Sequence, residues 1–203
     1  MTTIVLTPEA VIAVVDATRR WVERAVIGLN LCPFAKGVQA KGQVHYTVSD
    51  ADGAEALLAD LKLQLQELQA SDPVQRDTTL LIAPLAFPDF LDFNDFLDRA
   101  DRLLRKLRLD GDFQIASFHP AFQFADAPAE DISHFTNRAP YPILHLLRED
   151  SIDRAVEAFP DAALIFEKNV ATLRALGVAG WQALDVGPTL LCPMHAGTGD
   201  TSA

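Results

Sequence analysis

The sequence predicts a single-domain α/β fold, a layered sandwich in which helices flank a mainly parallel sheet of three to four strands. Three observations lead to this expectation. Segments with the two-residue period of strands alternate with segments of helical period along most of the chain. The 203 residues are 49% hydrophobic and 22% charged, which is typical of a globular domain. No internal repeat and no linker divides the chain.

The first part of the chain reads as a helix followed by a β-α-β-α-β order. Thr7 and Pro8 are residue types that start a helix, and the apolar spacing that follows ends near Asn30. Further helices are expected from about Asp52 and Asp89. Strands are expected at 43–50, 78–85 and 113–118. Because a helix separates each strand from the next, these connections are typical of right-handed crossovers between parallel strands.

A loop of about 20 residues follows the third strand, over 121–142, and loops of this length in a compact domain are often functional. The apolar segment 142–149 fits either a strand or a helix, and a strand is favoured because Ser151 would cap a new helix. A last helix is expected over 162–176, ended by Gly177.

Residues 1–178 are the predicted α/β domain, and residues 179–203 an irregular C-terminal tail. The formal net charge of −11 repels phosphate backbones and anionic lipids, so neither nucleic acid nor membrane is an expected partner. The N-terminus has no basic leader, and no apolar run reaches the length of a spanning helix. Two cysteines, Cys32 and Cys192, are too few for a disulfide scaffold. These features predict a cytoplasmic protein.

Hydrogen-bonding side chains gather in the segment FTNRAPYPILHLLRED, residues 135–150. Arg138 is the strongest candidate, because a guanidinium between Asn137 and a proline-braced turn suits a carboxylate or phosphate. A structural salt bridge is the alternative role. Tyr141 either donates to a ligand or anchors the loop. His145 either faces the same pocket or packs within the sheet.

Other candidates lie in two further motifs. His119, in SFHPAFQF, is a candidate acid/base because ligands bind beyond the carboxyl ends of strands. Cys32, in GLNLCPFAK, is a candidate nucleophile with Lys36 as an electropositive neighbour. A buried structural cysteine is the alternative, since the preceding helix C-terminus would raise the thiol pKa. His119, His134 and His145 have no short metal-ligand spacing, so no metal site is assigned. No nucleotide or hydrolase motif is present, and the cofactor stays unknown.

The motifs GLNLCPFAK, SFHPAFQF and NRAPYPILHLLRE, together with the helix expected from Ser151, resemble a family of bacterial conserved proteins catalogued as a domain of unknown function. The similarity covers roughly residues 8–178. The resemblance implies a single-domain cytoplasmic bacterial protein. It assigns no catalytic role to any residue of this chain.

Three functions therefore stay open. In the first, a small-molecule enzyme, Arg138 anchors an anionic metabolite and His119 transfers a proton, while Cys32 or a bound metal supplies the nucleophilic or electrophilic function. Its other substrate-binding residues would be Asn137, Tyr141, His145 and Lys36. The second is a non-catalytic ligand-binding or protein-interaction module, in which Cys32 and His119 are dispensable. The third is a metalloprotein with Cys32 and two histidines as ligands. The enzyme is favoured, and the oligomeric state is not predicted.

Overall fold

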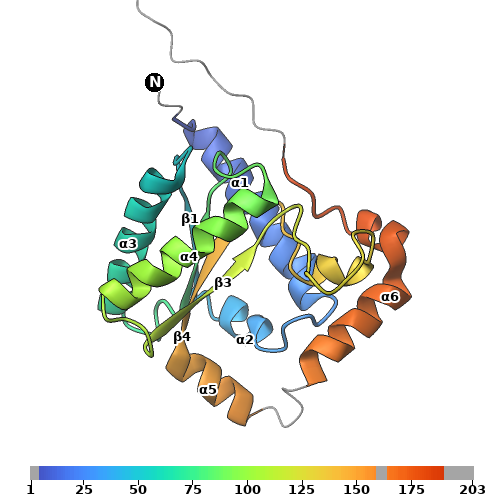
Figure 1. Cartoon of the computed structure of the whole chain (residues 1–203). Helices are drawn as coiled ribbons and strands as arrows, with labels where there is room; N and C mark the ends of the chain where they lie inside the picture. The colour runs from blue at the N-terminus through green and yellow to red at the C-terminus, as the bar shows by residue number, and fades with distance from the viewer. Residues whose placement is uncertain (1–4, 159–163, 190–203) are drawn as a thin grey trace, which may run out of the picture.

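A computed structural model describes residues 5–158 and 164–189 of the chain (Figure 1). The α-helices are α1 (Pro8–Trp21), α2 (Ala35–Ala40), α3 (Ala54–Ala70), α4 (Phe90–Lys106), α5 (Glu149–Glu157) and α6 (Ile165–Ala183). The strands are β1 (Val44–Val48), β2 (Thr78–Ile82), β3 (Phe113–Phe118) and β4 (Ile143–Arg148). A π-helix, η1 (Val22–Ile27), continues α1, and a 3-10 helix, η2 (Ile132–Thr136), lies within the long loop.

The four strands form one mixed sheet in the order β1-β2-β4-β3. β1 and β2 are parallel neighbours, whereas β4 is antiparallel to both β2 and β3. The strands β1, β2 and β3 therefore run in one direction, with β4 inserted against them. The α/β class and the strand count are confirmed. The prediction of a mainly parallel sheet is only partly right, since one neighbouring pair is parallel.

The direction of β4 follows from the path of the chain. β3 ends at Phe118, which pairs with Ile143 at the start of β4. The chain leaves and re-enters the sheet at the same edge, and no helix carries it back to the opposite edge. A parallel neighbour requires such a crossover, so β4 can only return antiparallel. The long loop is thus an extended hairpin connection.

Helices cover the two faces of the sheet with separate cores. α3 and α4 pack on one face, and α1 with η1 packs on the other (Figure 1). The first core includes Leu57, Leu61, Phe93, Phe96, Leu81, Leu144 and Leu146. The second includes Val14, Trp21, Leu80, Ile82, Ile143 and Tyr141. The all-buried β2 lies between the cores, which explains the consecutive apolar residues Leu80, Leu81 and Ile82.

Several predicted helix boundaries are confirmed and others move. Thr7 caps α1, accepting a hydrogen bond from the Ala10 amide, and Asp89 caps α4. The start predicted at Asp52 is shifted, because Gly53 is the N-cap of α3. α5 begins directly after β4, so Ser151 lies inside the helix rather than at its cap; its hydroxyl donates instead to Asp77.

Two glycines shape the ends of the long helices. A Cβ on Gly28, just after η1, would lie 2.2 Å from the Arg24 carbonyl oxygen, so the backbone leaves no space for a side chain. Gly177 has φ 67°, the left-handed conformation that glycine adopts readily. It interrupts α6 where the sequence predicted an end, but helical residues resume and continue to Ala183. Most of the predicted tail, from residue 190 on, lies outside the described residues.

In the described part of the chain, no helix combines the length and the apolar content that crossing a membrane would take.

Candidate functional site

The loop between β3 and β4 joins two of the sequence motifs. The His119 amide donates to the Asn137 carbonyl oxygen at 3.2 Å, and the Asn137 side-chain amide donates to the Ser117 carbonyl oxygen at 3.5 Å. The end of β3 is thereby continued by the residues that precede β4. SFHPAFQF and NRAPYP, far apart in sequence, form one unit beyond the carboxyl end of β3.

His119 is buried within this unit, with 1% of its surface exposed. Its Nδ1 accepts a hydrogen bond from the Ala121 amide at 3.0 Å, so Nε2 carries the proton and donates to the Phe87 carbonyl oxygen at 2.9 Å. The rings of Phe90 and Phe93 lie 5.5 and 5.3 Å away. Burial lowers the pKa of His119. With both nitrogens occupied, the geometry supports positioning of the loop more than proton transfer.

His134 plays the same role further along the loop. Its Nδ1 accepts from the Phe124 amide at 3.0 Å, and Nε2 then donates to the Pro128 carbonyl oxygen at 2.7 Å. The side chain is fully buried. Two neutral histidines thus satisfy main-chain groups of a loop that has little regular structure of its own.

Arg138 lies over an aromatic ring and is hydrogen-bonded to a main-chain carbonyl group. Its guanidinium carbon lies 4.3 Å from the centre of the Phe135 ring, and its Nε donates to the Phe122 carbonyl oxygen at 3.2 Å. Phe135 in turn packs edge-on against Trp181 of α6. The side chain is half-buried, and burial lowers its pKa. The plane of the guanidinium is therefore defined by a ring below it and a carbonyl group at one edge.

No carboxylate balances this charge. Among the described residues, no aspartate or glutamate forms an ion pair with Arg138, and its two Nη atoms have no hydrogen-bond partner there. Other described arginines without an ion pair, such as Arg102 and Arg105, are exposed to water, whereas Arg138 is half-buried. The predicted alternative, a structural salt bridge, is not found in this part of the chain. The Nη atoms of an arginine are the donors that bind carboxylates and phosphates through two parallel hydrogen bonds.

Tyr141 and His145 serve the packing around the loop. Tyr141 is 5% exposed, and its hydroxyl exchanges hydrogen bonds with the amide and carbonyl groups of Thr189. Burial raises the pKa of this phenol. His145 lies in β4, with Nε2 2.7 Å from the Thr78 hydroxyl of β2. Burial lowers the pKa of His145 to about 4. Tyr141 thus binds the main chain of Thr189, and His145 binds a side chain of the neighbouring strand.

The cysteine motif lies outside the loop unit, between η1 and α2. Cys32 follows η1 and is half-buried, and burial raises the pKa of its thiol above the usual value. Lys36, in α2, is exposed. Asn169 of α6 donates to the Leu31 carbonyl oxygen at 2.8 Å, which ties α6 to this motif. No hydrogen bond in the described structure joins Cys32 to His119 or Arg138.

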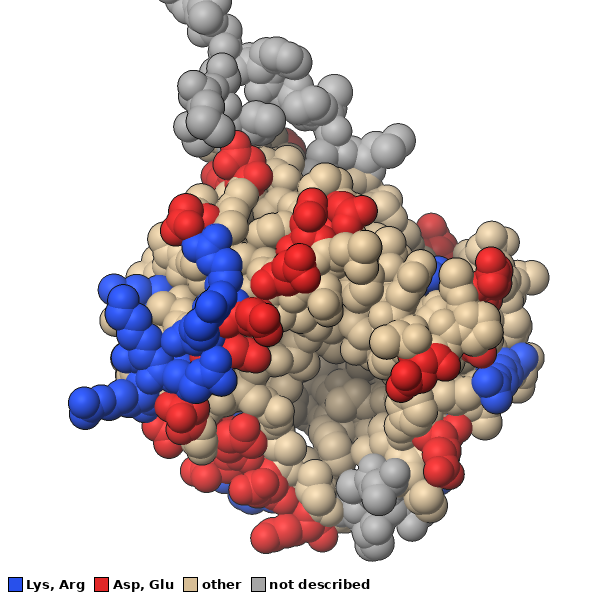
Figure 2. All heavy atoms as spheres, in the orientation of Figure 1, with Lys and Arg blue, Asp and Glu red and all other residues tan. Residues whose placement is uncertain are grey.

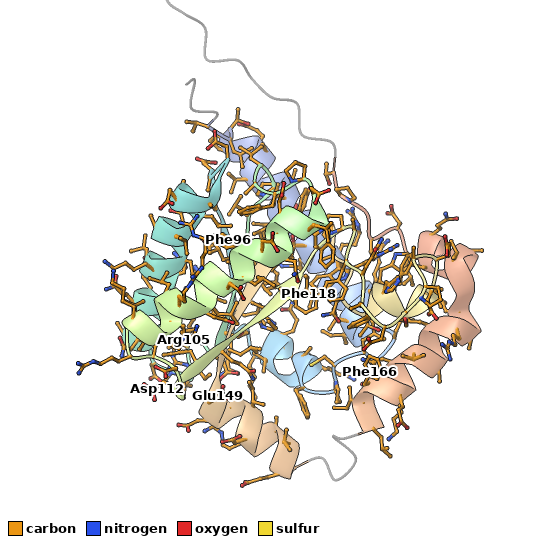
Figure 3. The ribbon with its side chains drawn as sticks, in the orientation of Figure 1. Phe96, Arg105, Asp112, Phe118, Glu149 and Phe166 are labelled. Atoms are coloured by element: carbon orange, nitrogen blue, oxygen red, sulfur yellow. The ribbon has the colours of Figure 1, made fainter. Side chains whose placement is uncertain are left out.

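A deep hollow opens on the face seen in Figure 2. By comparison with Figure 1 it lies between β3 and α6, with α2 behind it. Figure 3 labels Phe118 on the β3 side and Phe166 on the α6 side. Phe166 is 55% exposed although it contacts Phe124 edge-on. The hollow is bordered by elements that carry two of the three sequence motifs.

The predicted site residues thus fall into separate groups. His119, Asn137 and Arg138 share the loop unit, while Cys32 with Lys36 and His145 with Thr78 stand apart from it. In residues 5–158 and 164–189 no group of three or more histidine, cysteine or acidic side chains is arranged to hold a metal ion. Cys192 and His195, which the sequence left undecided, lie outside the described residues.

Sequence reasoning missed the partners that give Arg138 its geometry. The Phe135 ring and the Phe122 carbonyl group bind it from below and from one side. The motifs contain the signal for one of them, since Phe135 lies three residues before Arg138. Every residue type has a main-chain carbonyl group, so the sequence holds no signal for the contact with the Phe122 carbonyl oxygen.

The fold and the loop unit define a mixed α/β protein with a half-buried arginine at the carboxyl edge of its sheet. Residues 13–183 match the family model described as "Protein of unknown function (DUF1415)", and the chain belongs to this family. No curated protein and no solved structure matches the chain.

Proposed function

We propose that this protein binds a small metabolite carrying a carboxylate or phosphate group, with Arg138 as the anchor of that group. The observation that supports the proposal is a half-buried guanidinium with its face on Phe135, its Nε bound to a carbonyl oxygen and no acidic partner among the described residues. A cation removed from water costs free energy unless it is compensated. An anionic ligand at the Nη edge would supply that compensation.

The environment also favours a specific ligand over loosely held ions. The stacked ring and the Nε hydrogen bond restrict the side chain before binding, so little rotamer entropy is lost when a ligand arrives. The loop that presents Arg138 is braced by His119 and His134 through main-chain hydrogen bonds. A braced loop beyond the carboxyl ends of strands is a common place for ligands in α/β proteins.

The enzyme function expected from the sequence extends this proposal by a proton-transfer step. For His119 to perform it, the ring would have to release the Phe87 or the Ala121 main chain. Binding is therefore the first part to test. A cytoplasmic location, expected from the acidic composition and the two cysteines, belongs to the same proposal.

Thermal unfolding with a panel of anions tests the binding step. The panel holds inorganic phosphate, pyrophosphate, citrate, succinate and a nucleoside monophosphate. A ligand at about 100 times its Kd stabilises the folded state by about 2.7 kcal/mol, which raises Tm measurably. Arg138→Met keeps a straight apolar stem over Phe135 and removes the charge, and it should lose the response.

Arg174→Met is the matched control, because Arg174 is an exposed arginine paired with Asp131. It should keep the full response to any active anion. A Tm shift that persists in Arg138→Met would contradict the proposal. So would an Arg138→Met protein that is unfolded without ligand, since the role of Arg138 would then be structural.

A further inference from the structure

One face of β3 and β4 is only partly covered by helices. On the side of α3 and α4, three residues of these strands are buried: Phe113, Leu144 and Leu146. On the opposite side, α1 covers the end of the strands where Ile143 pairs with Phe118. Apart from Ile143, every residue of the two strands on this side is partly exposed, namely Gln114, Ala116, Phe118, His145 and Leu147.

His145 lies in the middle of this partly covered face. It pairs with Leu80 of β2 on one side and with Ala116 of β3 on the other. Leu80 is 3% exposed and belongs to the core under α1, whereas His145 and Ala116 are partly exposed. Because β4 has a hydrogen-bonded strand on each side, the exposed part of His145 is its side chain. The ring is surrounded by protein and is still reached from outside, so it borders a hollow.

This face of the sheet turns toward the hollow of Figure 2, between β3 and α6 with α2 behind it. α2 lies over the same face, since the Tyr46 hydroxyl of β1 donates to the Gln39 side-chain oxygen of α2 at 2.9 Å. The visible interior of the hollow is tan, so the described residues that form it there include no Lys, Arg, Asp or Glu. Acidic side chains lie around its rim. Such a hollow suits an uncharged ligand, because the acidic rim disfavours an anion.

The two ring nitrogens of His145 differ in what they bind. The Thr78 hydroxyl donates its proton to the Leu146 carbonyl oxygen, so Nε2 of His145 carries a proton and donates it to Thr78. Nδ1 is therefore a hydrogen-bond acceptor, and it has no partner among the described residues. The buried side-chain atoms without a partner in that part of the chain are Thr136 Oγ1 and Arg148 Nε, so Nδ1 of His145 is accessible. Burial lowers the pKa of His145 to about 4, and the ring stays a neutral acceptor at neutral pH.

We propose that the hollow binds a small uncharged ligand with an aromatic body and a hydroxyl group, and that this hydroxyl donates a hydrogen bond to Nδ1 of His145. Apolar walls with a few polar groups are typical of sites for such ligands. The Phe118 ring, 6.2 Å from the imidazole between ring centres, is one wall. Phe166 stands on the α6 side of the hollow (Figure 3). Between them the aromatic body packs on the apolar floor formed by Ala116 and Leu147.

Gln114 supplies a second polar group on the same face. It pairs with Leu147, two positions along the strands from the pair that Ala116 forms with His145. Side chains at such diagonal positions of a sheet lie within reach of one ligand. Its amide can donate and accept, so it suits a second polar substituent on the aromatic ring.

This site selects a different chemistry from the anion site proposed at Arg138. A carboxylate has no proton to donate to Nδ1, whereas the guanidinium of Arg138 has donors alone. A hydroxyl group on an uncharged ring suits His145 and lacks the charge that an arginine binds best. The two sites are therefore tested with different ligands.

4-Nitrophenol tests the proposal, because its ionised form is yellow and its neutral form is nearly colourless. At the pH where the free probe is half ionised, binding of the neutral form to His145 lowers the absorbance of the phenolate. Binding of the phenolate to an arginine would not lower it in this way, since it draws the equilibrium toward the ionised form. We expect excess wild-type protein to lower the absorbance until the change saturates. Benzyl alcohol, an uncharged competitor with a hydroxyl group, should reverse the change.

Two variants locate the bound probe. His145→Phe keeps a ring and removes Nδ1, so it should weaken binding about tenfold, as expected for the loss of one hydrogen bond. Ala116→Leu leaves the imidazole intact and fills the hollow beside it, so it should abolish binding. His45→Phe, at an exposed position of β1, is the matched control and should bind as the wild type does. Circular dichroism checks folding, and the variant that is folded decides if the other is not.

A wild-type protein that leaves the absorbance unchanged or raises it overturns the proposal. So does a decrease that is as large in a folded His145→Phe or Ala116→Leu protein as in the wild type, because the probe then binds elsewhere. A decrease that His145→Phe weakens, Ala116→Leu abolishes and His45→Phe leaves intact assigns the probe to the hollow.

Discussion

The Nε2 atom of His145 lies 2.7 Å from the Thr78 hydroxyl oxygen, and this hydroxyl donates its single proton to the Leu146 carbonyl oxygen at 2.6 Å. The imidazole must therefore be the donor toward Thr78. His145 is a neutral ring with its proton on Nε2, and the sheet determines that tautomer. Protonation of Nδ1 would place a positive charge between β2, β3 and β4.

Acid should destabilise the protein through His145. Burial lowers its pKa from 6.5 to about 4, so between these values the unfolded chain binds a proton that the folded chain does not. The stability from the neutral ring is fully present above pH 6.5 and falls as the pH drops toward 4. The loss amounts to roughly 3 kcal/mol at most. Urea unfolding at a series of pH values measures it.

His145→Gln is the comparison, because its side-chain amide can still donate to Thr78 but does not titrate. The free energy of unfolding of this variant should fall less between pH 6.5 and 4 than that of the wild type. Equal pH dependence in both proteins would show that His145 does not cause the loss. His119, whose pKa burial also lowers, contributes equally to both and cancels in the difference.

His119→Ala should destabilise the fold by roughly 2–4 kcal/mol. The substitution leaves the Phe87 carbonyl oxygen and the Ala121 amide without partners and opens a cavity beside Phe90 and Phe93. His45→Ala, at an exposed position of β1, should change stability by less than about 0.5 kcal/mol. A His119→Ala protein as stable as the wild type would instead support the acid/base role predicted from sequence.

Apolar patterning predicted most helices and three of the strands, whereas the segment of β4 fitted a strand or a helix and was assigned from its neighbour Ser151. Patterning works because burial on one face imposes a period that the residues themselves display, as in the leucines of α3. The direction of β4 has no such signature. Ile143 to Arg148 would read the same in either direction, and the path of the loop decided it.

The candidate site was predictable in its residues more than in their roles. Arg138 and His119 are polar side chains at an element end, which sequence can show. That both nitrogens of His119 bind main-chain groups depends on where the Phe87 and Ala121 backbones pass. Main-chain partners carry no residue identity, so the hydrogen bonds that hold His119 could not be predicted from the sequence. The main-chain hydrogen bonds of His134 could not be predicted for the same reason.

Cys32 should react slowly with iodoacetamide at neutral pH. Burial raises the pKa of its thiol above the usual value, so the reactive thiolate is scarce at neutral pH. Peptide mapping by mass spectrometry separates Cys32 from Cys192 in the same sample. We expect the alkylation rate of Cys32 to lie below that of a free cysteine peptide at neutral pH, and to level off at a higher pH than the rate of the peptide does. A high alkylation rate of Cys32 that no longer changes with pH near 7 would support its role as a nucleophile.

Arg148 should be the arginine on which the fold depends most. Its Nη2 lies 2.5 Å from the Leu68 carbonyl oxygen and 3.0 Å from that of Ser71, at the C-terminal end of α3. The last carbonyl groups of a helix have no partner inside it, and the dipole there favours a cation. The guanidinium also lies 5.4 Å from the Phe113 ring. Arg148→Met removes these interactions and should lower the free energy of unfolding by roughly 2–4 kcal/mol.

Urea unfolding of three variants separates this role from a general effect of charge. Arg148→Lys should recover part of the loss, because an ammonium group can reach one carbonyl oxygen but lacks the planar fork. Arg154→Met removes an exposed cation that contacts Ser151 at 2.8 Å and should cost less than about 0.5 kcal/mol. If Arg148→Met and Arg154→Met unfold at the same urea concentration, the capping of α3 by Arg148 contributes nothing to stability. The expected order of stability is Arg154→Met, then Arg148→Lys, then Arg148→Met, because the guanidinium of Arg148 binds two carbonyl oxygens at the end of α3, whereas Arg154 binds the exposed side of α5.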